Sequence, residues 1–368
     1  MVPLARALQN AGHTVSFATA APLHDTIRRD GFESDAAGLS HAEFIAARES
    51  DPRFAPARAD PRQARPLNFA LAFAGFEIPP RLADLESVIE NRRPDLIVHE
   101  TTEFAGPLAA ALRGLPAVTH SFGPLVEPEV MTAAGRSAAE HWVRAGLAPP
   151  DRGGMYDGLY LDITPPSVQF AEITTVPSRQ LLRPEPYLGQ VAETSGWDIG
   201  LSNDPVVAVT LGTVHGKDTA LFRTILDGLA DQDLVVAAAT GSSDITRALE
   251  PHPANARVHD WLPWATVLER ATVAVSHGGA GTTLACLYRG VPMVLVPVAA
   301  DHFTNCRALA PTGAAVVLER QRLTPAAVRQ AVESASSAPA RLAAARLAAE
   351  IQAMPSPEDV ASVLAELA

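Results

Sequence analysis

The sequence is poor in the features that mark secreted, membrane and nucleic-acid-binding proteins. It holds two cysteines in 368 residues, too few for a disulfide framework, so we expect a reducing cytoplasm. Lysine and arginine number 29 against 41 acidic residues, a formal net charge of −12, which leaves no basic surplus to displace counterions from nucleic acid. We find no apolar run of membrane-spanning length and expect no secretory leader. These absences favour a globular protein that binds small molecules.

The stretch Thr272–Asp301 has the pattern of a strand–helix–strand unit with an anion site. Thr272–Ser276 and Met293–Pro297 are short apolar runs typical of buried parallel strands. Between them we expect a helix that begins near Thr282, a favourable N-cap, and ends at Gly290. The loop before this helix would present backbone N–H groups at a helix N-terminus, where a phosphate is favoured.

The glycine-rich loop 277–281 matches neither common nucleotide motif. A dinucleotide fingerprint needs a glycine where Leu284 stands, and no lysine completes a P-loop. Gly279 and Gly281 lack side chains that would keep a diphosphate at a distance. His277 opens the loop at a strand's C-terminal end, where α/β proteins bind ligands. A glycine-rich turn with an idle histidine is the alternative that the residues leave open.

The sequence from Val206 onward alternates strands and helices and predicts a doubly wound sheet around this unit. Residues at its strand ends would line one crevice: Thr213, Thr240, Trp261, His277 and Asp301. A tryptophan at a strand end can stack on a flat ring, although most buried tryptophans only pack.

The first half departs from a regular doubly wound pattern in two places. It opens with a helix over Pro3–Ala11 and not with the strand that normally feeds it, so either the domain starts with a helix or the chain has been cut. From His41 to Phe76 the pattern gives way to Arg, Pro and Ala. We expect a long irregular segment there that forms part of an acceptor pocket.

Three titratable side chains follow a predicted strand at Pro94–Val98: His99, Glu100 and Glu103. A carboxylate in this position can orient and stabilise a histidine base. Glu100 or Glu103 can equally well cap the helix that follows. The residues alone do not decide between these interpretations.

Four motifs of the second half, DWLPW, SHGGAGTT, GVPMVLVP and ADHFTN, stand in an order and at distances that resemble the nucleotide-sugar-binding half of family 1 glycosyltransferases. The actinobacterial members that decorate natural products are the most similar. The first half agrees through VPLARALQNAGHTVSFAT, PDLIVHETTEFAGPLAAAL and GLPAVTHSFGP, so the resemblance covers nearly the whole chain. It implies an α/β protein of the GT-B fold, with two doubly wound Rossmann-like domains facing a central cleft.

The resemblance sets the expected domains. We expect an acceptor-binding domain over residues 1–186 without its first strand, a linker over 187–203, and a nucleotide-sugar-binding domain over 204–354. A C-terminal helix over 355–368 is expected to return to the first domain.

The resemblance also assigns roles to matching positions. Trp261 would stack on the nucleobase, with backbone near Leu262 at its edge, and Asp301 with His302 would read the sugar hydroxyls. Glutamine is usual in the family where His302 stands, so the identity of the donor sugar is open. The implied donor-binding residues are Thr213, Trp261, Leu262, His277, Gly279, Gly281, Thr282, Asp301 and His302. No metal ligand cluster is evident, and no cofactor beyond the nucleotide-sugar co-substrate is expected, since helix dipole and histidine would neutralise the leaving diphosphate.

The catalytic histidine implied by the resemblance has no counterpart in this sequence. The family carries it in a Gly-His-x-x-Pro loop just before the segment that resembles Val2–Ala5, whereas His13 matches a position at the other end of the first helix. Glu100 matches the acid that orients this histidine. We therefore expect a sequence that is short at its N-terminus, competent to bind donor and impaired in transfer.

The resemblance implies an inverting glycosyltransferase that moves a sugar from a TDP or UDP donor to a hydroxyl of an apolar natural-product aglycone. The Ala-, Leu- and Phe-rich stretch Leu67–Ile78 fits an apolar acceptor. A homodimer is a candidate assembly. The alternatives are a catalytically impaired homologue that acts as partner or activator, and a GT-B nucleotide-sugar epimerase.

Overall fold

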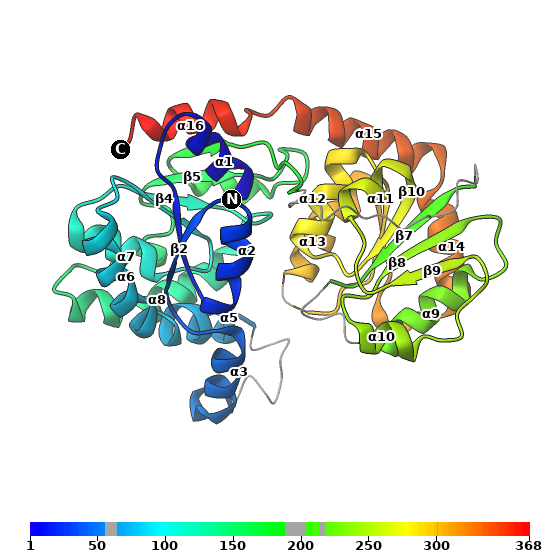
Figure 1. Ribbon diagram of the computed structural model, residues 1–368, viewed down its shortest axis with the longest axis horizontal. Coiled ribbons are helices and arrows are strands. Elements are labelled where there is room, and N and C mark those ends of the chain that lie inside the picture. Colours follow the sequence, from blue (N-terminus) through cyan, green and yellow to red (C-terminus); the bar gives the residue numbers. More distant parts are fainter. Residues whose placement is uncertain (56–64, 188–203, 213–217, 300) are drawn as a thin grey trace. The chain divides into compact units, whose positions relative to one another are not determined.

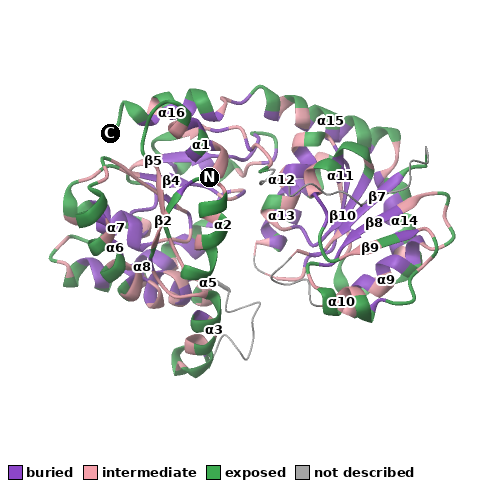
Figure 2. Cartoon of the chain, in the orientation of Figure 1, coloured by how far each residue is buried: buried purple, intermediate pink, exposed green. Residues whose placement is uncertain are grey.

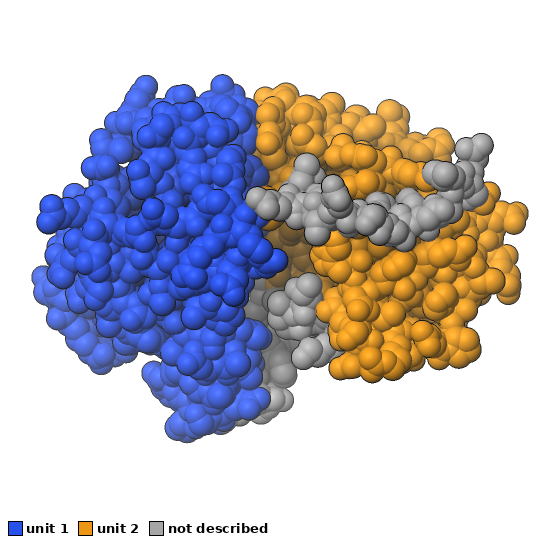
Figure 3. Space-filling view, viewed as in Figure 1, with its two compact units in different colours: residues 1–163, 171–182, 355–368 blue, residues 164–170, 183–354 orange. Residues whose placement is uncertain are grey.

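The computed structural model describes residues 1–55, 65–187, 204–212, 218–299 and 301–368 (Figure 1). The chain divides into two compact units (Figure 3). The first contains Met1–Ile163, Ala171–Leu182 and Pro355–Ala368, and the second contains Thr164–Phe170 and Arg183–Met354. The linker expected over 187–203 lies outside the described residues except for its first position.

Two short segments of the expected first domain, Thr164–Phe170 and residues 183–186, group with the second unit, and the first of them shows why. Within that unit the backbone N–H of Ser167 donates to Oε1 of Glu350 at 2.7 Å. The guanidinium carbon of Arg307 lies 4.5 Å from the centroid of the Phe170 ring. These contacts join residues about 140 to 180 positions apart, so the pattern of the segment itself could not reveal them.

The second unit is built on one parallel sheet of six strands in the order β12-β11-β10-β7-β8-β9. The strands are β7 (Val206–Thr210), β8 (Val235–Ala239), β9 (Ala256–His259), β10 (Ala271–Ser276), β11 (Met293–Leu295) and β12 (Ala315–Val317). Its helices are α9 (Thr219–Leu229), α10 (Ser243–Ala248), α11 (Trp264–Arg270), α12 (Ala280–Arg289), α13 (His302–Leu309), α14 (Pro325–Ala335) and α15 (Ala338–Gln352).

Short β-branched residues make the centre of this sheet. The valines of β7 and β10 are almost completely buried (Figure 2), as expected for parallel strands that are covered on both faces. Helices α9 and α14 pack against each other, and α11 and α12 pack together with α12 also against α15 (Figure 1). Each face of the sheet is thereby covered by helices, which leaves the ends of the strands as the place for a ligand.

The strand order of the second unit fixes where a ligand can enter. Counted from β7, the order is that of a doubly wound sheet whose direction reverses between β7 and β10, which lie side by side. Ligands of open α/β sheets bind outside the carboxyl ends of the strands at this reversal. Thr210 and Ser276 are paired at those two ends. The loops that follow them therefore meet at the predicted ligand position.

The first unit holds its parallel strands in two separate sheets. β1 pairs with β2, and β3, β4, β5 and β6 form the second sheet in that order. The strands are β1 (Ser16–Thr19), β2 (Glu33–Ala36), β3 (Ile97–Glu100), β4 (Ala117–His120), β5 (Leu159–Asp162) and β6 (Arg179–Leu181). In the described residues these two sheets are not joined by strand pairing, and the absence of a first strand from this unit stays a prediction.

Helices complete the first unit. They are α1 (Val2–Asn10), α2 (His24–Arg29), α3 (His41–Ser50), α5 (Arg65–Phe69), α6 (Ile78–Arg92), α7 (Ala105–Arg113), α8 (Pro128–Arg144) and α16 (Pro357–Ala365). Helix α16 packs against α1, and the capping box of Ser356 with Asp359 starts it. The end of the chain thus packs on its beginning.

The prediction of an irregular segment over 41–76 is wrong for its described parts. Helix α3 begins with a capping box in which Ser40 and Glu43 satisfy each other's backbone N–H groups. A turn of π-helix, Ala70–Phe76, continues α5. Rings from both parts pack together, with the centroids of Phe44 and Phe73 6.3 Å apart. Residues 56–64 lie outside the described residues, and the acceptor role of the segment stays a prediction.

Candidate functional site

The His277 imidazole lies in a cage of glycine backbone at the carboxyl end of β10. The residue is 8% exposed. A Cβ placed on Gly212, which follows β7, would lie 2.8 Å from the Cε1 and Nε2 atoms of the ring. A Cβ on Gly279 would come even closer to Nε2. Only glycine leaves room for the ring at these two positions, so the sequence of both loops is adapted to hold this histidine at the reversal of the sheet.

Helix α12 begins three residues earlier than expected, counted from one N-cap to the other. Gly279, with φ −65° and ψ 143°, is its N-cap, and Ala280 is its first residue. The expected N-cap, Thr282, lies within the first turn, because an extended N-cap conformation is open to glycine and leaves Thr282 free to be helical. A Cβ on Gly281 would meet no heavy atom within 4 Å. The first turn therefore has an open side at Gly281. Gly290 ends the helix in the left-handed conformation with φ 67°, which confirms the predicted end.

Asp301 is held against the start of this helix. Its Oδ2 accepts hydrogen bonds from the Ala280 backbone N–H at 3.1 Å and from Nδ2 of Asn305 at 2.8 Å. A carboxylate at this position is favoured by the helix dipole. Nδ2 of Asn305 also donates to the carbonyl oxygen of Gly278 at 2.7 Å. The acid loop and the glycine-rich loop are thus tied together. Asn305 is the last residue of the ADHFTN motif, but no role was predicted for it, because only the fold brings its two partners together.

His302 is buried beside His277. The two ring centroids are 4.4 Å apart with an interplanar angle of 82°, and His302 is 3% exposed. Its Nδ1 accepts from the backbone N–H groups of Val298 at 3.3 Å and Ala299 at 3.1 Å. The proton of a neutral ring therefore resides on Nε2. Any hydrogen bond from this ring to a sugar has to come from Nε2, and the predicted contact stays a prediction.

The remaining donor candidates divide between exposed and buried positions. Trp261 follows β9 and is 61% exposed, whereas the Leu262 side chain is 3% exposed. An exposed indole at a strand end is available for stacking. The Thr240 hydroxyl is turned inward to the Ser242 carbonyl at 2.9 Å and the Thr246 hydroxyl at 2.8 Å. Thr213 lies outside the described residues.

Glu100 and Glu103 of the first unit serve different backbone groups. Glu100 was predicted to lie beyond the strand, but it is the last residue of β3. Its Oε2 accepts from the Thr102 backbone N–H at 2.8 Å, and its Oε1 accepts from the Thr102 hydroxyl. Glu103 accepts from the N–H groups of Ala105 at 3.0 Å and Gly106 at 2.6 Å. Glu103 therefore caps α7, as the second interpretation held. The Glu100 carboxylate bonds to Thr102, and the Glu100 backbone carbonyl oxygen lies within hydrogen-bond distance of Nδ1 of His99, at 3.3 Å.

Burial sets the protonation of this region. It raises the pKa of Glu100, against the hydrogen bonds from Thr102, and raises the pKa of Glu103 to about 7, against the nearby Arg81. It also lowers the pKa of His99 to about 4 and that of His120 to about 3. A general base works best with a pKa near the working pH. The two buried histidines at the ends of β3 and β4 are therefore poor candidates for the base.

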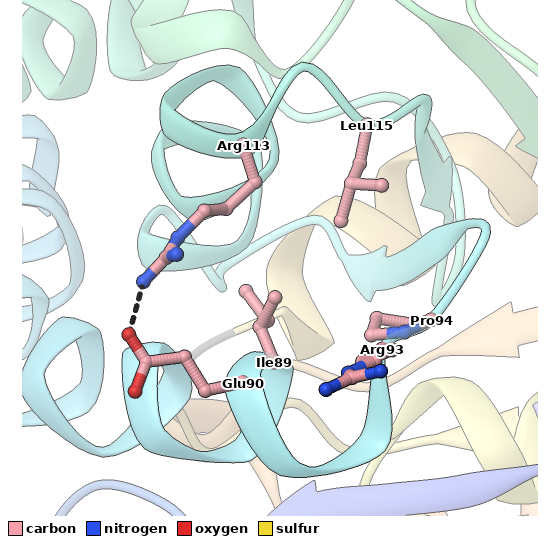
Figure 4. Close-up of a pocket in the computed structure, with 6 residues that line it drawn as sticks. All are labelled: Ile89, Glu90, Arg93, Pro94, Arg113 and Leu115. Atoms are coloured by element: carbon pink, nitrogen blue, oxygen red, sulfur yellow. Dashed lines mark hydrogen bonds and ion pairs between the residues drawn. The ribbon is translucent and has the colours of Figure 1, made fainter.

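A cavity of about 500 Å³ in the first unit lies away from these residues (Figure 4). Its lining comes from the ends of α6 and α7 and the turns after them: Ile89, Glu90, Arg93, Pro94, Arg113 and Leu115. Pro94 and Leu115 precede β3 and β4, so the cavity is at the amino ends of these strands. Arg113 and Glu90 form an ion pair across the cavity, with 2.9 Å between the guanidinium nitrogen and the carboxylate oxygen (Figure 4). Glu100 belongs to the opposite ends of the strands.

The described part of the chain contains no group of three His, Cys, Asp or Glu side chains placed to hold a metal ion. Within the same residues, no helix combines the length and the apolar character needed to cross a bilayer.

Solved structures of the same fold cover nearly the whole chain. The glycosyltransferase SnogD from Streptomyces nogalater superposes with a TM-score of 0.79 at 27% sequence identity, over 100% of this chain and 95% of that one. The glycosyltransferase SsfS6 from Streptomyces sp. SF2575, complexed with thymidine diphosphate, gives a TM-score of 0.80 at 25% identity over 99% and 95%. The chain is a glycosyltransferase of the GT-B fold.

Family models make the assignment more specific. The N-terminal domain of erythromycin biosynthesis protein CIII-like proteins matches residues 6–212, and the C-terminal domain matches residues 223–367. The elloramycin glycosyltransferase ElmGT of Streptomyces olivaceus is 34% identical over 331 residues, which are 87% of this chain and 81% of that protein. The protein belongs to the erythromycin biosynthesis protein CIII-like family, whose members serve the biosynthesis of antibiotics.

Proposed function

We propose that this protein transfers a sugar from a TDP or UDP donor to a hydroxyl group of an apolar natural-product aglycone, with inversion at the anomeric carbon. The observation that carries the proposal is the caged His277 at the reversal of the second sheet, beside the N-terminus of α12. A histidine and a helix N-terminus at one point form a site for a leaving diphosphate. The thymidine diphosphate in the structure of SsfS6 supports the same class of donor.

The second unit would bind the donor in three parts. His277 and the N–H groups of the first turn of α12 would take the diphosphate, with the open side at Gly281 as its approach. The exposed indole of Trp261 would stack on the base, and the backbone of Leu262 would pair with its edge. Asp301 and His302 would bind sugar hydroxyl groups, with Gly279, Thr282 and Thr213 supporting the phosphate contact.

The first unit would bind the acceptor. The acceptor oxygen would attack the anomeric carbon and pass its proton to a base, the role that the resemblance gives to a histidine with no counterpart in this sequence, while the bond to the diphosphate breaks on the opposite face. We propose that Glu100 orients this base. Its support is a carboxylate at the carboxyl end of β3, kept in place by two hydrogen bonds from Thr102. The aromatic residues around Phe44 and Phe73 favour an apolar acceptor.

The proposal is tested by incubating the purified protein with TDP-glucose, TDP-rhamnose or UDP-glucose and a panel of phenolic and macrolactone aglycones. We expect the protein to bind the donor and to form little glycoside, because the sequence has no counterpart of the histidine base. For the two glucose donors, which are α-linked, we expect the glycoside in the mass spectrum to show a β-linkage in the anomeric proton coupling. Retention of configuration would contradict the mechanism, and transfer at a rate ordinary for such enzymes would contradict the expected impairment. Donor binding with no transfer at all would favour the partner or activator alternative, and interconversion of the donor sugar would favour the epimerase.

A further inference from the structure

Asn305 occupies an unusual position among the residues around the glycine-rich loop. It is 2% exposed, and its amide nitrogen donates to the Gly278 carbonyl at 2.7 Å and to Oδ2 of Asp301 at 2.8 Å. A side-chain amide nitrogen has two protons, and these two bonds use both. The side chain therefore bridges two loops that are 23 residues apart, one before α12 and one before α13.

The Asn305 bridge matters because it joins the glycine-rich loop at Gly278 to Asp301. Gly278 is preceded by His277 and followed by Gly279, the N-cap of α12, so its backbone position sets the phosphate end of the site. Gly278 has φ +85°, and a Cβ there would lie 3.1 Å from Sγ of Cys306 on α13. The loop therefore packs directly on the helix that contains Asn305.

Asp301 would not be fixed by the helix N-terminus alone. Its bond to the Ala280 N–H is 3.1 Å long, and a ligand phosphate would compete for the same region of positive potential. The buried Asn305 amide is a second donor to Asp301, and it holds the carboxylate even when a phosphate also binds the Ala280 N–H. Hydrogen bonds to charged groups are also stronger than neutral ones.

We propose that Asn305 is a positioning residue for the donor: it fixes the Asp301 carboxylate relative to the diphosphate loop, and so sets the distance between the sugar and phosphate contacts. The inference rests on the proposed function, in which Asp301 binds the sugar. Asn305 itself does not touch the donor. Its loss weakens recognition of the sugar more than recognition of the nucleotide.

The test compares the binding of TDP and of TDP-glucose by calorimetry for the wild type, Asn305→Leu, Asn305→Ala and Asp301→Asn, with the double variant Asp301→Asn/Asn305→Leu. Asn305→Leu removes the donors at similar volume, and Asn305→Ala removes them by truncation, both without adding a charge. We expect affinity for TDP-glucose to fall about tenfold in either variant, as for one hydrogen bond to a charged group. Affinity for TDP is expected to fall far less. If the leucine variant does not fold, the alanine variant gives the same comparison.

Thr312→Ala is the matched control. The Thr312 hydroxyl donates to the Leu309 carbonyl at 2.7 Å and accepts from the Ala314 N–H at 3.1 Å, just beyond α13. Its loss destabilises the same region without touching Asp301. We expect this variant to keep the wild-type ratio of the two affinities.

The double variant shows whether Asn305 acts through Asp301. We expect Asp301→Asn/Asn305→Leu to discriminate between the two ligands as poorly as Asp301→Asn alone, because residues in one network are not additive. An equal loss for both ligands in the Asn305 variants, or a further loss of discrimination in the double variant, overturns the inference. Wild-type protein that binds TDP but gains nothing from the sugar also overturns it. A wild type that binds neither ligand refutes the proposed function itself.

Discussion

At the scale of residues, the space of the His277 ring is set by two glycines without side chains and by the neighbouring His302 ring. Gly212 and Gly279 leave a space that the imidazole fills, and His302 closes another side edge-on. Close packing makes such a ring sensitive to a single added methyl group. The two glycines are therefore as much a part of the proposed phosphate site as the histidine.

Replacing Gly212 by alanine tests this packing. The new Cβ would lie 2.8 Å from the His277 ring at a φ of +75°, so the ring or the loop has to move, and the backbone strain alone costs about 1 kcal/mol. We expect Gly212→Ala to lower the free energy of unfolding in urea by at least that amount and to weaken TDP binding in calorimetry. Unchanged TDP affinity would contradict the role of the cage.

Gly281→Ala provides the complementary test. Its Cβ would meet no heavy atom of the protein within 4 Å, and alanine is favoured over glycine in a helix by about 1 kcal/mol. We expect equal or higher stability in urea together with weaker TDP binding, because the methyl group would occupy the approach of the diphosphate. Equal TDP affinity would place the diphosphate elsewhere.

Glu103 gives the stability of the protein a pH dependence. Its pKa of about 7, against a reference of 4.5, means that the folded state holds the proton more tightly than the unfolded state. The resulting stabilisation is complete below pH 4.5 and is lost as the pH rises through 7. The difference between these two pKa values corresponds to a change of about 3 kcal/mol at most in the free energy of unfolding.

We therefore expect Glu103→Gln to gain stability over the wild type as the pH rises from 5 to 8. Glutamine can still accept from the N–H groups at the start of α7, but it does not titrate. The measurement is urea unfolding of both proteins at three pH values. A difference that is constant with pH would show that the carboxyl group is ionised at little cost.

The residues of the donor site were predictable to the extent that a strand end and a glycine-rich loop are visible in sequence. His277 satisfied both conditions. Asn305 satisfied neither, because its importance lies in two partners that only the fold brings to it. The two interpretations of Glu103 could not be separated, since the choice depends on which way its side chain turns.

At the scale of elements, α12 connects the phosphate loop to the rest of the second unit. Gly290 ends it at φ +67°, and a Cβ there would lie 3.4 Å from Cβ of Ala348 on α15. Alanine at this position faces the cost of the left-handed conformation, about 1 kcal/mol, and asparagine faces less. We expect Gly290→Ala to destabilise the protein in urea by about that amount and Gly290→Asn to fall between it and the wild type. Equal stability of all three would contradict the cap.

Elements were predicted well where a hydrophobic period and a cap coincided, and poorly elsewhere. Helix α3 was missed because the Arg, Pro and Ala content of the surrounding segment outweighed the Ser40–Glu43 capping box in the interpretation. The start of α12 was placed late because Thr282 is a better N-cap by preference than Gly279. Both helix starts carry a cap that is visible in the sequence, Ser40 for α3 and Gly279 for α12, but neighbouring residues favoured another structure or another start.

At the scale of the whole molecule, the order of the strands carries the functional argument. Alternating strands and helices predicted parallel sheets, and the order β9-β8-β7-β10-β11-β12 places Gly212 and His277 just after the carboxyl ends of two adjacent strands at the reversal. The placement of Thr164–Phe170 with the second unit could not be predicted, because it depends on contacts with distant residues such as Glu350.

The most direct test of the account is a calorimetric titration of TDP into the wild-type protein and into His277→Ala. The account predicts one TDP per chain for the wild type and at least tenfold weaker binding for the variant, as expected for the loss of one charge-assisted contact to a phosphate. Equal affinities, or no binding by a folded wild type, would contradict the assignment of the His277 loop as the diphosphate site.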